Sequence, residues 1–584
     1  MTTSLFDADS LLAVDVGEIN TRAVLFDVVD GRYRFLAIGT APTTAAAPYQ
    51  DIGEGIRLAI NHLQEITGRT LVGSDDRLIM PGRADGSGVD TFAATLSAGP
   101  PLKVVAAGLL DDISLESARH LAATTYSQVS EALSLNDRRK QETRIDAIIR
   151  QRPDLIIVAG GTDGGASQSV MQMIENVGLA CYLFPEGYRP EILFAGNQDL
   201  VDEVDGMLKP IANLHFAPNV RPVLEREQLD PAHARLAELF RALRARQIPG
   251  VSELNAWSGQ RLTPTATAFG RIIRFLSKVY DPAKGVLGVD IGASATTVAA
   301  AFTGDLTLGV YPQFGLGKGL AGMHNQASVE RIKRWLPLEV GEDHLRDYIY
   351  NKSLYPGTIP AIEEDLWIEQ ALARQALRAA VSLASRSFPK ELARSAPGFL
   401  PWFEPVVAAG SVFTRAPSPG HSMLMLLDAL QPTGVTTLVL DQNNLAAPLG
   451  SAAAINPILV VQVLESNTFL SLGTVISPLA NVRPGTPVLR IRAKYESGEE
   501  VNMEIKQGTL DVLPLAAGRS ARLNLIPLHR AEVGMGGPGR GGSLKVTGGA
   551  LGVVIDARGR PLRLPSDPGR RGELYKKWLW MLGG

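Results

Sequence analysis

The sequence predicts an α/β protein with two similar lobes, an α/β region inserted into the first lobe, and an all-β domain at the C-terminus. Two matching strand–glycine–strand segments, at 11–28 and 286–302, indicate the two lobes. From about residue 476, short β-like runs separated by Gly/Pro turns indicate a third part. The expected units are a first lobe at 1–284 with the insertion around 77–215, a second lobe at 285–475, and a β-rich domain at 476–584.

The composition is that of an ordinary globular chain, and it argues against several classes of partner. With 584 residues, the chain is too long for one hydrophobic core, so three or more folding units are expected. A net charge of −3 gives no electrostatic reason to expect a nucleic acid or an anionic membrane as partner. The most apolar tract, 445–480, is interrupted by Pro, Asn, Gln and Glu residues, which favours buried core over a membrane span.

Cysteine usage and the first residues predict a cytoplasmic protein. The single cysteine, Cys181, cannot form an internal disulfide, which suits a reducing compartment. Its neighbours are mostly apolar, so we expect a buried, inert thiol. The acidic start MTTSLFDADS lacks the basic stretch and apolar run of a signal peptide. The eight histidines show no zinc-ligand spacing, so no zinc site is predicted.

Hydrophobic periodicity predicts the remaining elements. A helix is expected at 54–66, and strands alternate with helices over 77–215, which is typical of parallel α/β layers. Residues 220–280 should be largely helical. A long amphipathic helix is expected from about 361 to 387 in the second lobe.

The two strand–glycine–strand segments carry residues suited to a polyphosphate. In each, a strand ends in an aspartate and a glycine turn follows: Asp15 with Gly17, and Asp290 with Gly292. Backbone N–H groups of such turns can face phosphate, and the aspartate can hold Mg²⁺ and its waters. We therefore expect the turns to face each other across a cleft and to bind ATP with Mg²⁺.

A third loop, 408–411, consists of small residues and follows an apolar strand. An adenine or ribose could lie against its backbone, although a plain strand-to-helix turn is the alternative. Asp15 and Asp290 are the candidate catalytic and metal-binding residues. The candidate nucleotide-binding residues come from the same three loops: Gly17, Asn20, Thr21, Arg22, Gly292, Ala293, Ser294, Gly410 and Ser411.

Several polar features leave two interpretations open. Arg22 could reach phosphate or point into solvent. Asp441, at a strand end, could contribute to the cleft or cap a helix. Asp163 could bind a ligand, although Asp beside glycines more often forms a turn. The G-x-G-x-x-G match at 317–322 lacks the strand and helix of a dinucleotide site, and we interpret it as a flexible loop near the cleft.

The order of these motifs resembles that of the actin, sugar-kinase and heat-shock-chaperone superfamily. More closely, residues 10–460 resemble the GlmL/MutL-type accessory proteins of methylaspartate (glutamate) mutase. The matching segments are DVGEINTRAVLFD, LKVVAAGLL, VAGGTDGGASQSV, LFAGNQDLVDEV, VDIGASATTV and LDQNNLAAPLGSAAAINP. The resemblance implies a two-lobed actin-like (ribonuclease H-like) ATPase core. It also implies an ATP-binding, chaperone-like role for an adenosylcobalamin-dependent mutase.

One departure from this family predicts slow or absent ATP hydrolysis. Such proteins usually carry Gly-Gly and a later Asp in the second hairpin, whereas Ala293 and Ser294 follow Gly292 here, and Thr297 stands where the Asp is expected. A threonine hydroxyl brings no charge to the metal or the attacking water. Losing one such group typically costs on the order of 10²–10³ in rate.

Two other functions are compatible with the same motifs. One is an actin-like structural or scaffold protein that uses nucleotide for self-assembly. The other is a small-molecule kinase, which needs an aspartate general base and a polyol pocket that the sequence does not identify.

Overall fold

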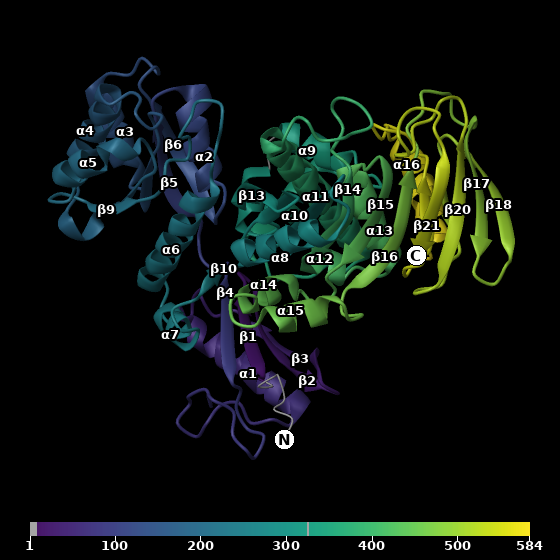
Figure 1. Ribbon diagram of the computed structural model, residues 1–584, viewed down its shortest axis with the longest axis horizontal. Coiled ribbons are helices and arrows are strands. Elements are labelled where there is room, and N and C mark those ends of the chain that lie inside the picture. Colours follow the sequence, from purple (N-terminus) through teal and green to yellow (C-terminus); the bar gives the residue numbers. More distant parts are fainter. Residues whose placement is uncertain (1–8, 324–325) are drawn as a thin grey trace.

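The computed structural model describes residues 9–323 and 326–584, and its strands form four sheets (Figure 1). One sheet belongs to the first lobe, one to the inserted region, one to the second lobe, and one to the C-terminal tail. The inserted region and the tail lie at opposite ends of the molecule (Figure 1). None of the helices in the described part is long and apolar enough to cross a membrane.

The first lobe contains a five-stranded sheet in the order β10-β4-β1-β2-β3. Its strands are β1 (Leu11–Val16), β2 (Asn20–Val29), β3 (Arg32–Pro42), β4 (Thr91–Leu96) and β10 (Thr263–Pro264). Helix α1 (Ile52–Thr67) packs on this sheet, and helix α8 (Thr265–Val279) follows β10 and packs on the strands of the second lobe. Helix α1 begins where the Asp51 carboxylate accepts the Gly53 N–H at 2.7 Å, and it ends at Gly68, whose φ of 70° suits glycine.

The inserted region is a parallel sheet in the order β6-β5-β7-β8-β9. Its elements are β5 (Leu102–Gly108), η1 (Asp111–Leu115), α2 (Glu116–Ala122), β6 (Ser127–Ser134), α3 (Gln141–Gln151), β7 (Leu155–Val158), α4 (Gln168–Leu183), η2 (Glu186–Tyr188), β8 (Glu191–Phe194), η3 (Gln198–Leu200), α5 (Val201–Leu208) and β9 (Asn213–Phe216). Helices α6 (Asp230–Gln247) and α7 (Val251–Trp257) lead back to the first lobe. Cys181 lies buried in this region, and burial raises the pKa of its thiol to about 12, so the predicted inert thiol is confirmed.

The second lobe is built on an eight-stranded sheet in the order β13-β12-β11-β14-β15-β16-β22-β19. Its own strands are β11 (Gly285–Ile291), β12 (Thr296–Phe302), β13 (Asp305–Tyr311), β14 (Phe403–Ala409), β15 (Gly434–Leu440) and β16 (Leu470–Ser477). Its helices are η4 (Pro312–Phe314), η5 (Lys318–Met323), α9 (Gln326–Lys333), α10 (Glu342–Leu354), α11 (Glu363–Ala384), η6 (Ser385–Ser387), α12 (Ser411–Thr414), α13 (Pro419–Leu430), α14 (Ala446–Ala452) and α15 (Pro457–Leu464).

The two lobes repeat one topology. In the first lobe β3, β2 and β1 are antiparallel neighbours, and β4 and β10 continue the sheet parallel to β1. In the second lobe β13, β12 and β11 are antiparallel neighbours, and β14 and β15 continue parallel to β11. The repeated strand–glycine–strand pattern in the sequence therefore corresponds to a repeated strand arrangement in the structure. The predicted α/β fold class with two similar lobes is confirmed.

The C-terminal tail contributes strands to two different sheets. Strands β17 (Pro487–Tyr495), β18 (Glu500–Lys506), β20 (Ser520–Pro527) and β21 (Gly542–Thr547) form an antiparallel four-stranded sheet. Strand β22 (Val553–Asp556) instead pairs parallel with β16, and β19 (Leu510–Leu513) pairs with β22. Helix α16 (Pro568–Met581) ends the tail. The expected boundary at 476 thus falls inside β16, and the second-lobe sheet continues beyond it.

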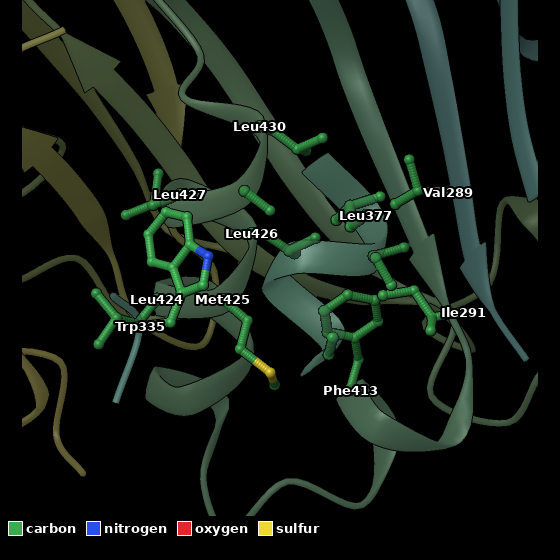
Figure 2. Close-up of a cluster of buried hydrophobic side chains, with 14 of the residues drawn as sticks. Val289, Ile291, Trp335, Leu377, Phe413, Leu424, Met425, Leu426, Leu427 and Leu430 are labelled. Carbon is green, nitrogen blue, oxygen red and sulfur yellow. The ribbon is translucent and has the colours of Figure 1, made fainter. Parts of the chain in front are cut away.

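The apolar core of the second lobe joins its sheet to its helices and to the tail. Figure 2 shows Val289 and Ile291 of β11 facing Leu377 of α11 and the leucines of α13. Trp335 is fully buried in the same cluster (Figure 2). Burial of this kind supplies most of the driving force for folding, so the lobe and the tail residues packed on it share one core.

A charged network lies buried at the edge of this core. Asp428 of α13 accepts bonds from Arg374 Nε and from Arg558 Nη1, both at 2.8 Å. Arg558 also binds Asp556, whose other carboxylate oxygen accepts a bond from Arg560 at 2.7 Å. Both acids and all three arginines are buried, and the paired arginines hold the pKa of Asp556 well below its usual range despite burial. The network ties the tail to helices α11 and α13.

Candidate functional site

A cleft of about 670 Å³ lies between the two lobes and is lined by the three predicted loops. The first strand pair contributes the turn 17–20, the second contributes the turn 292–295, and the loop after β14 contributes 409–412. The volume is within the usual range for small-molecule and cofactor sites, roughly 300–1,000 Å³.

The two turns have the same backbone geometry. The Gly17 N–H donates to the Asn20 carbonyl at 3.0 Å, and the Gly292 N–H donates to the Ala295 carbonyl at 3.0 Å. A side chain at Gly17 would lie 2.9 Å from that carbonyl oxygen, so the first turn requires glycine. Each turn therefore brings a short stretch of backbone to the cleft from opposite lobes.

Asp15 is buried at the cleft and accepts three hydrogen bonds. Its Oδ1 accepts bonds from Thr95 Oγ1 at 2.7 Å and Thr265 Oγ1 at 3.1 Å. Its Oδ2 lies 3.1 Å from Arg22 Nη1, because residues 15 and 22 are opposite each other in the β1–β2 pair. Arg22 therefore pairs with Asp15 at the cleft wall, rather than pointing freely into solvent.

Two further carboxylates lie close enough to Asp15 to be repelled by it. Burial and then the charge of Asp15 raise the pKa of Asp290 to about 7, although Arg22 opposes the shift. Burial raises the pKa of Asp441 to about 6, while its bonds from the Leu445 and Ala446 N–H groups oppose that shift. Asp441 thus both lines the cleft and binds the N–H groups at the start of α14.

This arrangement of acids fits a divalent cation that is shared with a ligand. In the part of the chain that the structure describes, no three acid, His or Cys side chains are grouped closely enough to hold a metal alone. Mg²⁺ usually takes one or two carboxylates and completes its shell with water and phosphate oxygens. Asp15 and Asp290 fit that requirement, because a cation would relieve the repulsion between them.

The third loop is fixed against the second turn. Gly410 has a φ of 110°, and an added Cβ would collide with the Ile291 carbonyl oxygen, so only glycine fits there. The Gly410 N–H donates to Asn444 Oδ1 at 3.1 Å. Ser411 then begins α12, and its half-buried side chain lies at the cleft wall.

Most of the predicted site residues line the cleft, and one does not. Thr21 is fully buried beside the cleft, and its hydroxyl is 2.9 Å from that of Thr43, so the structure gives it a packing position. Those that do line the cleft are Asp15, Gly17, Asn20, Arg22, Asp290, Gly292, Ala293, Ser294, Gly410 and Ser411.

Several cleft residues were not predicted from the sequence. Tyr126 comes from the inserted region, and burial and the charges of Asp290 and Asp15 raise the pKa of its hydroxyl. Thr265 comes from the start of α8. Leu366 and Gln370 come from α11, which also lines the cleft.

Comparison of the sequence with known protein families shows to which family the chain belongs. The model of the family described as "MutL protein" matches residues 11–468, which is most of the chain. The chain belongs to the MutL family. Protein MutL of Clostridium tetanomorphum is 28% identical over 216 residues, covering 36% of this chain and 45% of that protein. The aligned part thus spans less than half the length of this curated relative.

Solved structures also align with this MutL-family chain, at low similarity. One is component A of (R)-2-hydroxyglutaryl-CoA dehydratase from Acidaminococcus fermentans, at 11% identity, with 76% of this chain and 97% of that chain covered and a TM-score of 0.25. Another is the ethanolamine utilization protein EutJ from Carboxydothermus hydrogenoformans, at 11% identity, with 77% and 91% covered and a TM-score of 0.26.

Two sequence features of this MutL-family chain that had more than one interpretation can be placed by their local structure. Residues 317–322 come after the antiparallel strand β13 and lie mostly in the 3-10 helix η5 (Lys318–Met323), which is not the setting of a dinucleotide site. Asp163 accepts bonds from Asn219 Nδ2 at 2.8 Å and from the Gln198 N–H at 3.1 Å. It therefore joins three loops of the inserted region.

Thr297 is buried on β12 directly opposite Asp290, in the position that Arg22 has opposite Asp15. Thr297→Asp should therefore place a second acid beside Asp290. We expect faster turnover of Mg²⁺-ATP, by up to roughly 10²-fold, because such a group can orient water and metal. Steady-state phosphate release checks this, with Thr297→Asn as the control of similar size. Equal rates for both variants would contradict the expectation.

Proposed function

We propose that this MutL-family chain binds ATP with Mg²⁺ in the interlobe cleft and acts as a slow, chaperone-like nucleotide switch on a protein partner. The observation that carries the proposal is the pair of equivalent turns, one from each lobe, on the same cleft as the buried Asp15 and Asp441 and the half-buried Asp290. Backbone N–H groups on two sides and acids at the floor suit a polyphosphate with its cation.

The cleft residues divide into three roles in this proposal. The turns 17–20 and 292–295 would hold the phosphates through backbone N–H groups. Asp15 and Asp290 would hold Mg²⁺, which when bound supplies positive charge to the phosphate oxygens. The base would lie between the loop at Gly410 and the N-terminal half of α11, where Leu366 offers an apolar surface.

The proposed partner is an adenosylcobalamin-dependent mutase, and the proposed role is to help it keep intact cofactor. Membership of the MutL family and the resemblance to glutamate mutase accessory proteins support this proposal. Retention of a purified adenosylcobalamin-dependent glutamate mutase on the immobilised chain, with and without Mg²⁺-ATP, tests it. Retention that does not depend on nucleotide would argue against a switch.

Asp15→Ala tests nucleotide binding directly. We expect calorimetric titration to show ATP affinity that no longer increases with Mg²⁺, because the carboxylate that would hold the cation is gone. Asp305→Ala, which removes an exposed acid from β13, should keep the Mg²⁺ dependence. Unchanged Mg²⁺-ATP affinity in Asp15→Ala would contradict the proposed site.

A further inference from the structure

A glycine-rich loop is packed backbone-to-backbone against the second turn. The Leu316 N–H donates to the Gly292 carbonyl at 2.9 Å. An added Cβ at Gly315 or Gly317 would lie 2.5 or 2.8 Å from the Ala293 carbonyl oxygen, so neither position has room for a side chain. The loop and the turn therefore behave as one unit of the second lobe.

The next residue in this loop, Lys318, reaches across to the other lobe. Its Nζ lies 2.9 Å from Oε1 of Glu18, which belongs to the first turn. The other oxygen of Glu18, Oε2, accepts the Gly99 N–H at 2.9 Å, so the carboxylate is held in place. The Lys318 side chain is 61% exposed, whereas that of Glu18 is 11% exposed. Lys318 is thus the more mobile partner of the pair.

Glu18 is out of place in a turn that receives phosphate, because its negative charge repels the ligand. Three cations line the cleft: Arg22 is paired with Asp15, Lys352 is paired with Glu369, and Arg415 is an exposed residue that follows the third loop. The carboxylates that line the cleft are Asp15, Glu18, Asp290, Glu363, Glu369 and Asp441. Lys318 does not itself line the cleft, but its Nζ contacts Glu18, which does, so Lys318 is the lysine that can turn from Glu18 to a phosphate at the first turn.

We propose that Lys318 is a phosphate-binding residue of this cleft, and that Glu18 competes with the nucleotide for it. The inference rests on the proposed function and adds a residue that sets the preference for triphosphate. A lysine is a point charge on a flexible stem, and a polyphosphate is a stronger partner for it than one carboxylate. Because the Lys318 side chain is 61% exposed, water screens its pairing with Glu18 and lowers the cost of the exchange.

The two members of the pair should have opposite effects on ATP affinity. Lys318→Met should lower the affinity for Mg²⁺-ATP by about ten-fold, because one charge-assisted contact is lost. The affinity for ADP should fall less and the affinity for AMP should not change, because the contact is to the terminal phosphates. Glu18→Gln should strengthen Mg²⁺-ATP by a few-fold, because Lys318 no longer has a competing partner.

Calorimetric titration of the full chain with ATP, ADP and AMP in Mg²⁺ tests the inference. The double variant E18Q/K318M should not show the increased Mg²⁺-ATP affinity of Glu18→Gln. Lys318→Arg, which keeps the positive charge, should bind Mg²⁺-ATP more tightly than Lys318→Met. Lys390→Met, at an exposed lysine of the same lobe, is the control for general loss of charge.

The outcomes distinguish this inference from its alternatives. If the pair were only a structural contact between the lobes, Lys318→Met and Glu18→Gln would shift ATP affinity in the same direction, and AMP would shift with ATP. That result, or unchanged affinities for ATP, ADP and AMP in Lys318→Met, would overturn the inference but would not contradict the proposed ATP binding. If the unaltered chain bound no nucleotide, the proposed function would fail and this inference with it.

Discussion

Replacing Asp428 by asparagine should lower the free energy of unfolding by about 3–5 kcal/mol, the usual cost of removing one partner from a buried ion pair. Asp428 accepts bonds from Arg374, Arg558 and the hydroxyl of Tyr575 at 2.8, 2.8 and 3.1 Å. Without its charge, Asp556 alone would have to balance three buried arginines. Thermal and urea unfolding of the two proteins measure the difference.

The control for this prediction is a pair of similar geometry on the surface. Arg490 and Glu504 lie 3.0 Å apart on the four-stranded sheet, with side chains 59% and 41% exposed. Glu504→Gln should cost at most about 1 kcal/mol, because water screens such pairs. If Asp428→Asn cost no more than Glu504→Gln, the buried network would not be what joins the tail to the second lobe.

Replacing Asp290 by asparagine should stabilise the ligand-free protein at pH 8 and remove its response to Mg²⁺-ATP. The pKa of Asp290 is raised from an ordinary 3.8 to about 7 by burial and by the charge of Asp15. Between these values the folded chain holds a proton that the unfolded chain has lost. Stability therefore falls as pH rises from about 4 to 7, by an amount on the order of 4 kcal/mol.

Asparagine cannot ionise, so the variant avoids this loss. The gain in thermal stability of Asp290→Asn over the parent should be large at pH 8 and should vanish near pH 4. Asp305→Asn, at an exposed position, should show no such pH dependence. A variant less stable than the parent at pH 8 would show that interactions other than the charge of Arg22 stabilise the Asp290 carboxylate.

The local parts of the site could be predicted from the sequence because neighbouring residues form them. The turn at Gly17 and its counterpart at Gly292 follow from strand patterns only a few residues long. The predicted helix at 361–387 is found at Glu363–Ala384 for the same reason, since its apolar period is local. The sequence pattern does not show which group Arg22 contacts, although residues 15 and 22 are direct neighbours in an antiparallel pair.

The distant parts of the site could not be predicted in this way. Thr265 donates to Asp15 across 250 residues of sequence, and no short pattern records that contact. Strand β22 pairs with β16 after the chain has passed through the four-stranded sheet, so the change in composition at 476 does not reveal where the second-lobe sheet ends. The division of the chain at 476 stays a prediction about folding units.

Tyr126 connects the inserted region directly to the cleft, because it belongs to that region and lines the cleft. Its ring lies at the cleft floor near Asp15 and Asp290, one residue before β6. Nearby, the Val310 N–H of the second lobe donates to the Ala123 carbonyl at 2.6 Å. A rotation of the inserted sheet relative to the second lobe would therefore break this hydrogen bond. It would also shift Tyr126, which lines the cleft. A partner that binds and displaces the inserted region could therefore change the shape of the cleft.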